Sequence, residues 1–392
     1  MPHHPSAFNR LLEPLDGREV RRIVARHGGD HGVGSGPRAL TCVRQLRMLL
    51  FAQVTGLSSL RELCEGLLAR PGSLYHMGLG VPRRSTLADA MAKRPVAVFR
   101  DICSALLPRV QRSVRRESDA LITLLDATPV NIRDPRSDWA EADARTRGLK
   151  LHLGFEPRAD ALSWIDLTSP KISDVTAARA MPIEAGTTYV YDKGYLDFGW
   201  WHKVHAAGAC FVSRLKTNTK RRDVHPRTGL LEPGILGDAT LRIGHKAPRG
   251  GAANPLFDTV LREIVVERDG KTPLVLITND LTRPASEVAA LYKERWQIEL
   301  LFKWIKQNLK IKRFLGRSEN AVKIQIYVAL IVWLLLRLMH SRMAPTGHTK
   351  SLLTRLKTAL FAPLNLSNHA KPPPRRPGTT PIFPQLALDL SA

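Results

Sequence analysis

Cysteine is scarce in this sequence, and its four copies lie far apart. Cys42, Cys64, Cys103 and Cys210 form no CxxC pair and no spacing typical of a zinc site or a disulfide framework. We therefore predict reduced and mostly buried thiols, as in a cytosolic protein. The opening residues, MPHHPSAFNRLLEPL, lack the basic-then-apolar order of a secretory signal, so we do not expect export.

Long apolar runs and nucleotide-binding motifs are also missing. The longest run, IYVALIVWLLLRLM at residues 326–339, contains Arg337 and is shorter than the roughly 20 residues that span a bilayer. It predicts a buried core helix, and no membrane partner is expected. The sequence has no GxSxG, no GxxxxGK(S/T) and no GxGxxG after a strand, so we expect no nucleotide cofactor.

Negative charge is in short supply. The chain has 35 Asp and Glu against 59 Lys and Arg, which gives a formal charge of +24 and a pI near 10.5. Such a protein attracts polyanions, so nucleic acid is the first partner to consider and an anionic membrane the second. A ribosomal or non-specifically adhesive basic protein would show the same balance, so charge alone does not choose among them.

Helical spacing dominates the first part of the chain. With 392 residues, 44% of them hydrophobic, the chain is long enough for two or three structural units. Apolar residues recur at three- and four-residue intervals over residues 8–107, interrupted by two Gly-rich stretches. Residues 1–115 are therefore predicted to form a helical N-terminal domain.

The pattern changes to strands at residue 120. Short apolar or alternating runs cover residues 120–130, 149–157 and 161–169, which predicts a three-stranded meander. A fourth run, TTYVYDKGY, enters a turn at Asp192, and a helix over 198–207 and a strand over 209–216 follow. This β-β-β-α-β-α-β order predicts an α/β fold with a mixed sheet flanked by helices.

The remaining segments are an insertion, two helices and a tail. Residues 217–272 are polar and rich in Gly and Pro, and we predict a β-rich insertion with a hairpin turn at Asp269-Gly270. Helical spacing returns over 286–311 and 318–340. We therefore assign residues 116–345 to a catalytic domain interrupted by that insertion. Residues 346–392 form a C-terminal segment, whose Pro-rich part at 371–384 is predicted to be disordered.

Two aspartates stand where expected strands end. Asp126 ends an apolar strand in LLDATP, where a buried charge is costly unless something such as a metal ion neutralises it. Asp192 ends the YVYD strand in the same way. Each of them is also a residue type that forms turns, so each aspartate alone is a weak indication of function.

One expected helix carries a more specific pattern. Tyr292, Arg295, Glu299 and Lys306 are separated by three, four and seven residues, which places all four on one helical face. The alternative is a surface helix on which Arg295, Glu299 and Lys303 form exposed salt bridges.

Taken together, these motifs resemble a known family. The strings DATP, YVYDKGY and YKERWQIELLFKWIK are similar to the DDE transposases of bacterial insertion sequences, in the insertion-sequence-four branch with its Y-(2)-R-(3)-E-(6)-K motif. The resemblance covers residues 120–338 and includes the flanking strings FVSRLKTN and LVLITNDL. One departure is Ala127 after Asp126, where Ser or Gly is common, although Thr128 keeps the next position.

The resemblance implies a fold, a reaction and a set of site residues. The fold would be ribonuclease H-like, and the protein would cleave DNA at element ends and join them to target DNA. Asp126, Asp192 and Glu299 would be the catalytic residues and would hold two Mg²⁺ or Mn²⁺ ions about 4 Å apart. Tyr292, Arg295 and Lys306 would bind DNA phosphates.

Further basic residues are candidate contacts along double-stranded DNA, although each run is equally typical of a solvated face. They are Lys193, Arg214, Lys216, Lys303, Lys310, Lys312 and Arg313. Trp296 and Trp304 are predicted to lie in the core, because aromatic residues at helical spacing usually pack inward. We expect the N-terminal helices to bind element ends and a homodimer to form in the synaptic complex. The location implied is the bacterial cytoplasm, in association with the nucleoid.

Two other functions remain open. One is a ribonuclease H-like nuclease that hydrolyses DNA without strand transfer. The other is a catalytically inactive DNA-binding regulator derived from a transposase. All three carboxylates and their Tyr, Arg and Lys partners are present, which argues against gross loss of the site.

Overall fold

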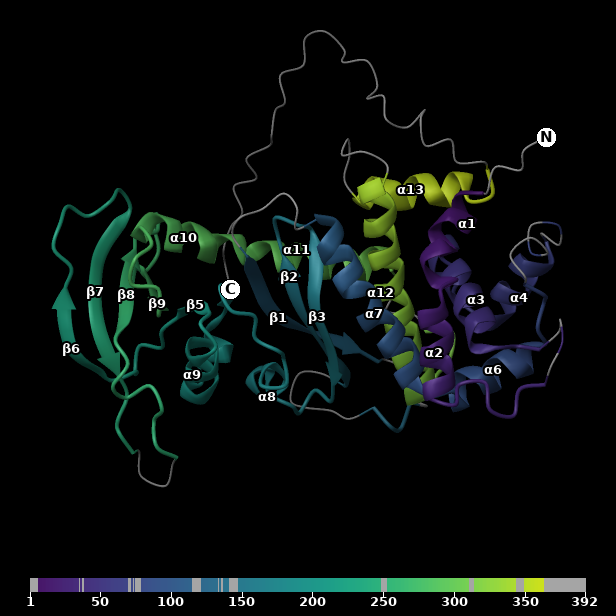
Figure 1. Cartoon of the computed structure of the whole chain (residues 1–392), viewed down its shortest axis with the longest axis horizontal. Coiled ribbons are helices and arrows are strands. Elements are labelled where there is room, and N and C mark those ends of the chain that lie inside the picture. The colour runs from purple at the N-terminus through teal and green to yellow at the C-terminus, as the bar shows by residue number, and fades with distance from the viewer. Residues whose placement is uncertain are drawn as a thin grey trace, which may run out of the picture.

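The computed structural model shows an elongated molecule with a helical bundle at one end and a long twisted sheet extending from it (Figure 1). Two short 3₁₀ helices, η1 (Glu13–Leu15) and η3 (Lys193–Tyr195), belong to its connecting segments. The structure describes residues 6–34, 36, 39–69, 72, 74, 79–114, 121–132, 134, 137–140, 147–247, 252–309, 314–342 and 349–362. The Pro-rich stretch at 371–384 lies outside the described residues.

The first five strands form the expected mixed sheet. The first three are antiparallel in the order β3-β2-β1, which confirms the predicted meander. The fourth pairs parallel with the first, and the fifth pairs parallel with the fourth. This arrangement, with helices on both faces, confirms the ribonuclease H-like fold. The strands are β1 (Ile122–Asn131), β2 (Gly148–Glu156), β3 (Ala161–Thr168), β4 (Thr188–Tyr191) and β5 (Cys210–Arg214).

Four more strands extend the same sheet. They pair antiparallel in sequence order, and the last of them pairs with β5, so the full order is β3-β2-β1-β4-β5-β9-β8-β7-β6. The predicted hairpin turn is confirmed, because Asp269-Gly270 lies between β8 and β9 and Gly270 has a φ of 63°. The strands are β6 (Arg221–Pro226), β7 (Ile235–Ile243), β8 (Leu261–Val266) and β9 (Leu274–Thr278).

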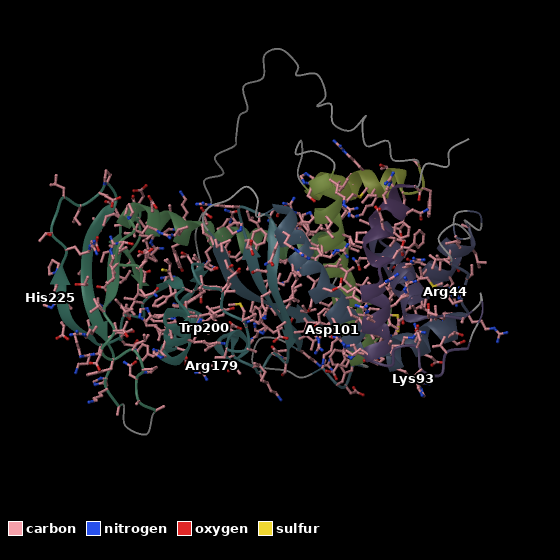
Figure 2. The ribbon with its side chains drawn as sticks, viewed as in Figure 1. Arg44, Lys93, Asp101, Arg179, Trp200 and His225 are labelled. Atoms are coloured by element: carbon pink, nitrogen blue, oxygen red, sulfur yellow. The ribbon has the colours of Figure 1, made fainter. Side chains whose placement is uncertain are left out.

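Helices cover both faces of the sheet, and the sheet separates two apolar cores. Successive strand residues point to opposite faces, so Leu124 enters one core and Leu125 the other. The Leu125 core lies under α8 (Asp174–Ala178) and α9 (Phe198–Ala206) and includes Trp200 (Figure 2). The Leu124 core lies under α10 (Ala285–Glu294) and α11 (Trp296–Asn308), on the opposite side of the sheet in Figure 1.

The helical end is built around one central helix. This helix, α12 (Glu319–Arg342), packs against α7, α3, α6, α13, α1 and β3. All four cysteines are free, as the sequence predicted. Only two of them are buried and the other two are half-buried, so the expectation of mostly buried thiols holds only in part. The other helices of this end are α1 (Ala7–Leu12), α2 (Arg18–Arg26), α3 (Cys42–Thr55), α4 (Leu60–Leu68), α6 (Arg84–Lys93), α7 (Val96–Val114) and α13 (Thr349–Ala359).

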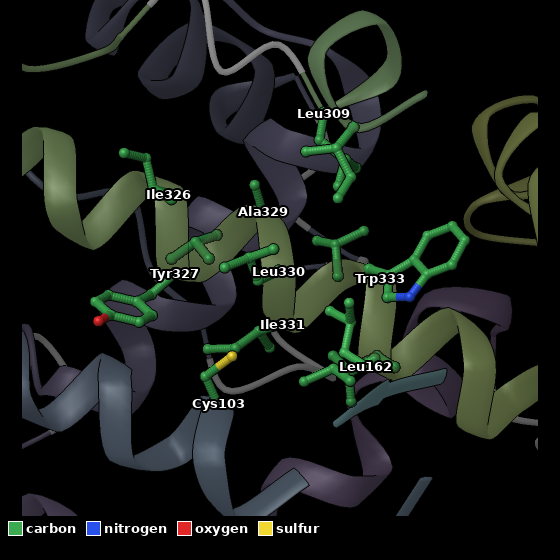
Figure 3. Close-up of a cluster of buried hydrophobic side chains, with 14 of the residues drawn as sticks. Cys103, Leu162, Leu309, Ile326, Tyr327, Ala329, Leu330, Ile331 and Trp333 are labelled. Atoms are coloured by element: carbon green, nitrogen blue, oxygen red, sulfur yellow. The ribbon is translucent and has the colours of Figure 1, made fainter. Parts of the chain in front are cut away.

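The apolar run at 326–339 forms the buried part of α12. Figure 3 shows Tyr327, Leu330, Ile331 and Trp333 of this helix among side chains from α7 and β3. The Trp333 ring makes an edge contact with Trp304 at 4.7 Å between ring centres, so Trp304 lies in the core as predicted. Among the described helices, α12 alone is long and apolar enough to cross a membrane, but 94% of its most apolar window is buried inside the protein.

The single helix predicted over 286–311 is wrong. The structure has two helices, α10 and α11, which meet at Arg295. Around this residue the hydrogen bonds shorten to three-residue steps, from the Arg295 N–H to the Tyr292 carbonyl and from the Ile298 N–H to the Arg295 carbonyl. α10 packs on β4, β5, β7 and β8 whereas α11 packs on β1, so each helix follows a different part of the twisted sheet. Residues 310–311 lie outside the described part of the chain.

Gly148 allows β2 to begin beside β1. Its φ is 143°, and an added Cβ would overlap the carbonyl oxygen of Val130 on the neighbouring strand. We therefore expect Gly148→Ala to lower the free energy of unfolding by about 1–3 kcal/mol, measured by urea denaturation. Gly34→Ala is the control, because an added Cβ there meets no atom within 4 Å. Equal urea midpoints for the two variants would contradict this account of Gly148.

Candidate active site

The sheet brings the two aspartates next to each other. Leu125 of β1 pairs with Tyr191 of β4 in parallel register. Asp126 directly follows Leu125, and Asp192 directly follows Tyr191. Adjacent strands lie about 4.8 Å apart. The two residues predicted from separate motifs therefore lie at the same level on neighbouring strands. The prediction that Asp126 ends its strand is wrong, because β1 continues through Asp126 to Asn131 in antiparallel pairing with β2.

Asp126 is a largely buried carboxylate. Its side chain is 23% exposed, and its Oδ1 accepts a hydrogen bond of 2.8 Å from the Ala127 N–H. Burial raises the pKa of Asp126 to about 6. Glu299 and Asp192 raise this pKa further, whereas the Ala127 N–H and Arg295 lower it. A buried acid among other acids is a place that favours a cation.

Asp192 begins the turn that follows β4. It occupies the N-terminal cap of η3, and its Oδ1 accepts a hydrogen bond from the Gly194 N–H. The Ser213 hydroxyl on β5 donates to the backbone carbonyl of Asp192 at 3.2 Å. The conformation of this turn therefore determines where the second carboxylate points.

Glu299 reaches the site from α11 and is joined to Asp126 through Arg295. The Arg295 Nη2 lies 2.6 Å from the Glu299 Oε1, and its Nη1 lies 3.7 Å from the Asp126 Oδ2. The guanidinium carbon is also 5.9 Å from the centre of the Tyr292 ring. Glu299 and Asp126 thus share one positive charge, which comes from the residue where α10 meets α11.

Lys306, about two turns after Glu299, binds α11 to the same strand. Its Nζ donates a hydrogen bond of 2.6 Å to the Thr128 hydroxyl on β1. Asp126, Thr128, Glu299, Lys303, Lys306 and Gln307 are among the residues that line a cleft of about 330 Å³ between β1 and α11. The cleft is open to solvent at a place where acidic and basic side chains meet.

The other predicted DNA contacts lie around the site with varied exposure. Lys193, Lys216 and Lys303 are exposed, and Arg214 is half-buried at the end of β5. Lys310, Lys312 and Arg313 lie outside the described residues.

The prediction that Trp296 is a core residue is wrong. Trp296 begins α11 and its side chain is 43% exposed, and Leu300 one turn later is 42% exposed. With Lys303 and Gln307 they form the exposed stripe of α11, beside the cleft. Helical spacing put Trp296 and Trp304 in the same class, although only Trp304 points toward the sheet and α12. Their separation of eight residues turns the two side chains about 80° apart on α11, so they do not share a face.

The donor chemistry of this site fits a divalent metal ion. Carboxylate oxygens are the preferred ligands of Mg²⁺, and the Arg295 guanidinium already holds a positive charge between Asp126 and Glu299. Among the described residues, no three His, Cys, Asp or Glu side chains are close enough together to hold an ion as they stand. The Arg295 guanidinium thus lies between the carboxylates of Asp126 and Glu299, and Asp192 lies beside Asp126 on the neighbouring strand.

Comparisons with known proteins agree with this arrangement. A family model described as a transposase DDE domain matches residues 117–335, and a domain of unknown function matches residues 3–80. The chain is 38% identical over 312 residues to a putative transposase of Sinorhizobium fredii, which covers 76% of this chain and 85% of that protein. It is 49% identical over 271 residues to a putative transposase for the insertion sequence element IS4SA of Synechocystis, which covers 65% of this chain and 71% of that protein.

Two further similarities are weaker. The chain is 25% identical over 287 residues to a probable transposase for an insertion sequence element of Geobacillus stearothermophilus, covering 69% of this chain and 70% of that protein. Among solved structures, it is similar to the piggyBac transposase in a synaptic complex with hairpin DNA, with a TM-score of 0.49 and 10% identity over 95% of this chain and 86% of that one. On the strength of the family model and the Sinorhizobium relative, this chain belongs to the DDE transposases of insertion sequences, which are divalent-metal-dependent enzymes that act on DNA.

Proposed function

We propose that this transposase cleaves DNA at the ends of an insertion sequence and transfers the strands into target DNA, with Asp126, Asp192 and Glu299 as catalytic residues. The observation that carries this proposal is the meeting of Asp126 and Glu299 across Arg295 at an open cleft, with Asp192 one strand away. These three carboxylates would be the protein ligands of two Mg²⁺ or Mn²⁺ ions. When bound, two such ions activate the attacking oxygen and stabilise the leaving one.

Arg295 has two partners in this proposal. Without an ion, its guanidinium neutralises Asp126 and Glu299. With DNA in the cleft, the same fork is suited to a phosphate, to which it can donate two parallel hydrogen bonds. Tyr292 lies beside the guanidinium and Lys306 lies further along the cleft, so both would contact the neighbouring backbone.

The DNA path would extend from the cleft over nearby exposed groups. Lys193, Arg214, Lys216 and Lys303 supply positive charge for the backbone, and the exposed Trp296 ring supplies a face on which a base can stack. We assign catalysis to residues 116–345, which the 217–272 insertion interrupts, and end binding to the helices of residues 1–115. The chain would act as a homodimer in the synaptic complex, on nucleoid DNA in the bacterial cytoplasm.

A joining assay tests the proposed reaction. The full chain is incubated with Mg²⁺, DNA that carries the element ends, and a target plasmid. We expect both cleaved ends and joined products. Cleavage without joined products at every Mg²⁺ and protein concentration would identify a nuclease, whereas end binding without cleavage would identify an inactive regulator.

Arg295→Ala tests the phosphate role. Because a charge-assisted hydrogen bond contributes about 1.5–3 kcal/mol, we expect the variant to bind element ends roughly 10- to 100-fold more weakly. Arg179→Ala is the control, because it removes an exposed arginine of similar charge from the end of α8. End binding is measured by gel shift at fixed salt. Unchanged end binding and cleavage in Arg295→Ala would reject this role.

A further inference from the structure

A buried histidine lies on the face of the sheet opposite α11. His152 on β2 pairs with Ala127, the residue after Asp126, and its side chain is fully buried. Its Nε2 lies 2.9 Å from the Thr168 hydroxyl, which donates its own proton to the Ser169 carbonyl at 3.1 Å. With the Thr168 proton on the Ser169 carbonyl, the Nε2 carries the ring proton and Nδ1 is an acceptor. Among the described residues, this Nδ1 has no hydrogen-bond partner.

The bare nitrogen faces Asp174, the first residue of α8. The Nδ1 of His152 lies 3.9 Å from the Asp174 Oδ1, which is too long for a hydrogen bond and cannot be one because both atoms are acceptors. The positive charge that pairs with Asp174 is Lys150, which lies two residues before His152 on β2. Its Nζ lies 3.2 Å from the same Asp174 oxygen and donates to the Ile172 carbonyl at 2.8 Å.

Asp174 also stands directly behind the turn that carries Asp192. α8 packs against η3, and Gly194 of η3 lies between the two carboxylates. A Cβ on Gly194 would lie 2.9 Å from the Asp192 Oδ1 and 3.9 Å from the Asp174 Oδ2. The next residue, Tyr195, is buried, and its hydroxyl has no hydrogen-bond partner among the described residues. The Lys150–Asp174 pair thus joins β2 to the back of this turn.

This cluster of Lys150, His152, Asp174 and Tyr195 lowers the stability of the folded protein. A partly buried ion pair contributes little net stability, because desolvation offsets the attraction between the charges. The bare His152 nitrogen and the Tyr195 hydroxyl add buried polar atoms without partners, which also oppose folding. Apolar side chains in these positions would pack at a lower cost, so stability alone does not account for the cluster.

We propose that Lys150 and Asp174, backed by His152, are positioning residues that hold the η3 turn and thereby aim Asp192 at the catalytic metal. This inference rests on the proposed role of Asp192 as a metal ligand. It adds three residues that no sequence motif singled out, because they come from β2 and α8 and meet only in the folded chain.

Mn²⁺ binding to the full chain without DNA tests the proposal, together with the Mg²⁺ dependence of end cleavage. Groups that orient a metal ligand typically contribute 10- to 100-fold to metal affinity. We therefore expect Lys150→Met and Asp174→Asn each to weaken Mn²⁺ binding by about that factor and to raise the half-saturating Mg²⁺ concentration equally. In the double variant the two losses should not multiply, because the residues act as a pair.

The sign of the Lys150→Met effect separates positioning from simple electrostatics. Removing a positive charge near a cation site would by itself tighten Mn²⁺ binding, so tighter or unchanged binding would overturn the proposal. Lys150→Met also leaves α8 intact, and this keeps the test decisive if Asp174→Asn unfolds that helix. Arg179→Gln is the matched control, because it breaks an ion pair of 2.7 Å at the other end of α8 and should leave Mn²⁺ binding unchanged (Figure 2).

Asp192→Asn distinguishes this inference from the proposed function. If Asp192→Asn weakens Mn²⁺ binding and Lys150→Met does not, the positioning cluster is wrong while the proposed metal site stands. If Asp192→Asn has no effect on Mn²⁺ binding or cleavage, the proposed site is wrong and the inference fails with it.

Discussion

Glu299→Gln is expected to reduce end cleavage by about 1,000-fold or more while element ends still bind. The substitution keeps the size of the side chain but removes the negative charge that α11 brings to the cleft. Losing a metal ligand removes several kcal/mol of transition-state charge stabilisation, and each 1.4 kcal/mol is tenfold in rate. Cleavage is measured on DNA that carries the element ends, and binding by gel shift.

Glu287→Gln is the matched control for this change. Glu287 is an exposed glutamate in the first turn of α10, away from the cleft. The Glu287→Gln variant should cleave element ends at the rate of the unmodified protein. If Glu299→Gln cleaves as fast as Glu287→Gln, Glu299 is not a catalytic residue. Loss of end binding together with cleavage would instead show that Glu299 acts through folding or DNA contact.

Asp126→Asn is expected to abolish cleavage and yet to stabilise the metal-free protein. The pKa of Asp126 is about 6 in the folded state, against 3.8 for the unperturbed group. Between these values the folded state binds more protons than the unfolded state, so the free energy of unfolding falls as pH rises through this range. At pH 7 the whole penalty is present, and the neutral amide removes it.

The size of this gain follows from the shift. Two pKa units correspond to roughly 3 kcal/mol, and partial exposure of the carboxylate reduces this, so we expect a gain of about 1–3 kcal/mol at pH 7. Urea unfolding with EDTA present measures it, and the difference between the two proteins should shrink toward zero near pH 4. Lower stability of the variant at pH 7 would contradict the burial argument. In the unmodified protein, added Mg²⁺ should recover the loss by binding the folded state.

The sequence was informative wherever function depends on local spacing. Consecutive apolar residues such as Leu124 and Leu125 predict a strand with two buried faces, and an acid directly after them predicts a costly charge. Asp126 lies within one such strand and Asp192 directly follows another, and the parallel pairing of these two strands in one sheet places the two residues side by side. The carboxylate of Glu299 on α11 was likewise found from its position four residues after Arg295 and seven after Tyr292.

Helical spacing was not sufficient where the chain leaves regular structure. Aromatic residues at helical spacing usually pack inward, so Trp296 and Trp304 were both expected in the core. On α11 the two side chains point about 80° apart, so Trp296 is exposed while Trp304 is buried. The Arg295 guanidinium, at the break between α10 and α11, lies between Asp126 and Glu299. The two helices pack on different strands of a twisted sheet, and this difference in tertiary packing is not visible in helical spacing alone.

The sequence by itself determined the strands, the motif residues and the basic charge that together indicate a DNA transposase. Periodicity and motif spacing are properties of residues close together in the sequence, and net charge is a property of the composition, so none of them depends on the fold. Only the tertiary structure decided that Arg295 occupies the position between the carboxylates, that Lys306 is bound to Thr128, and that Lys150 and Asp174 stand behind the Asp192 turn. These contacts join residues from different elements, and their geometry depends on how the sheet twists and on which face each helix covers.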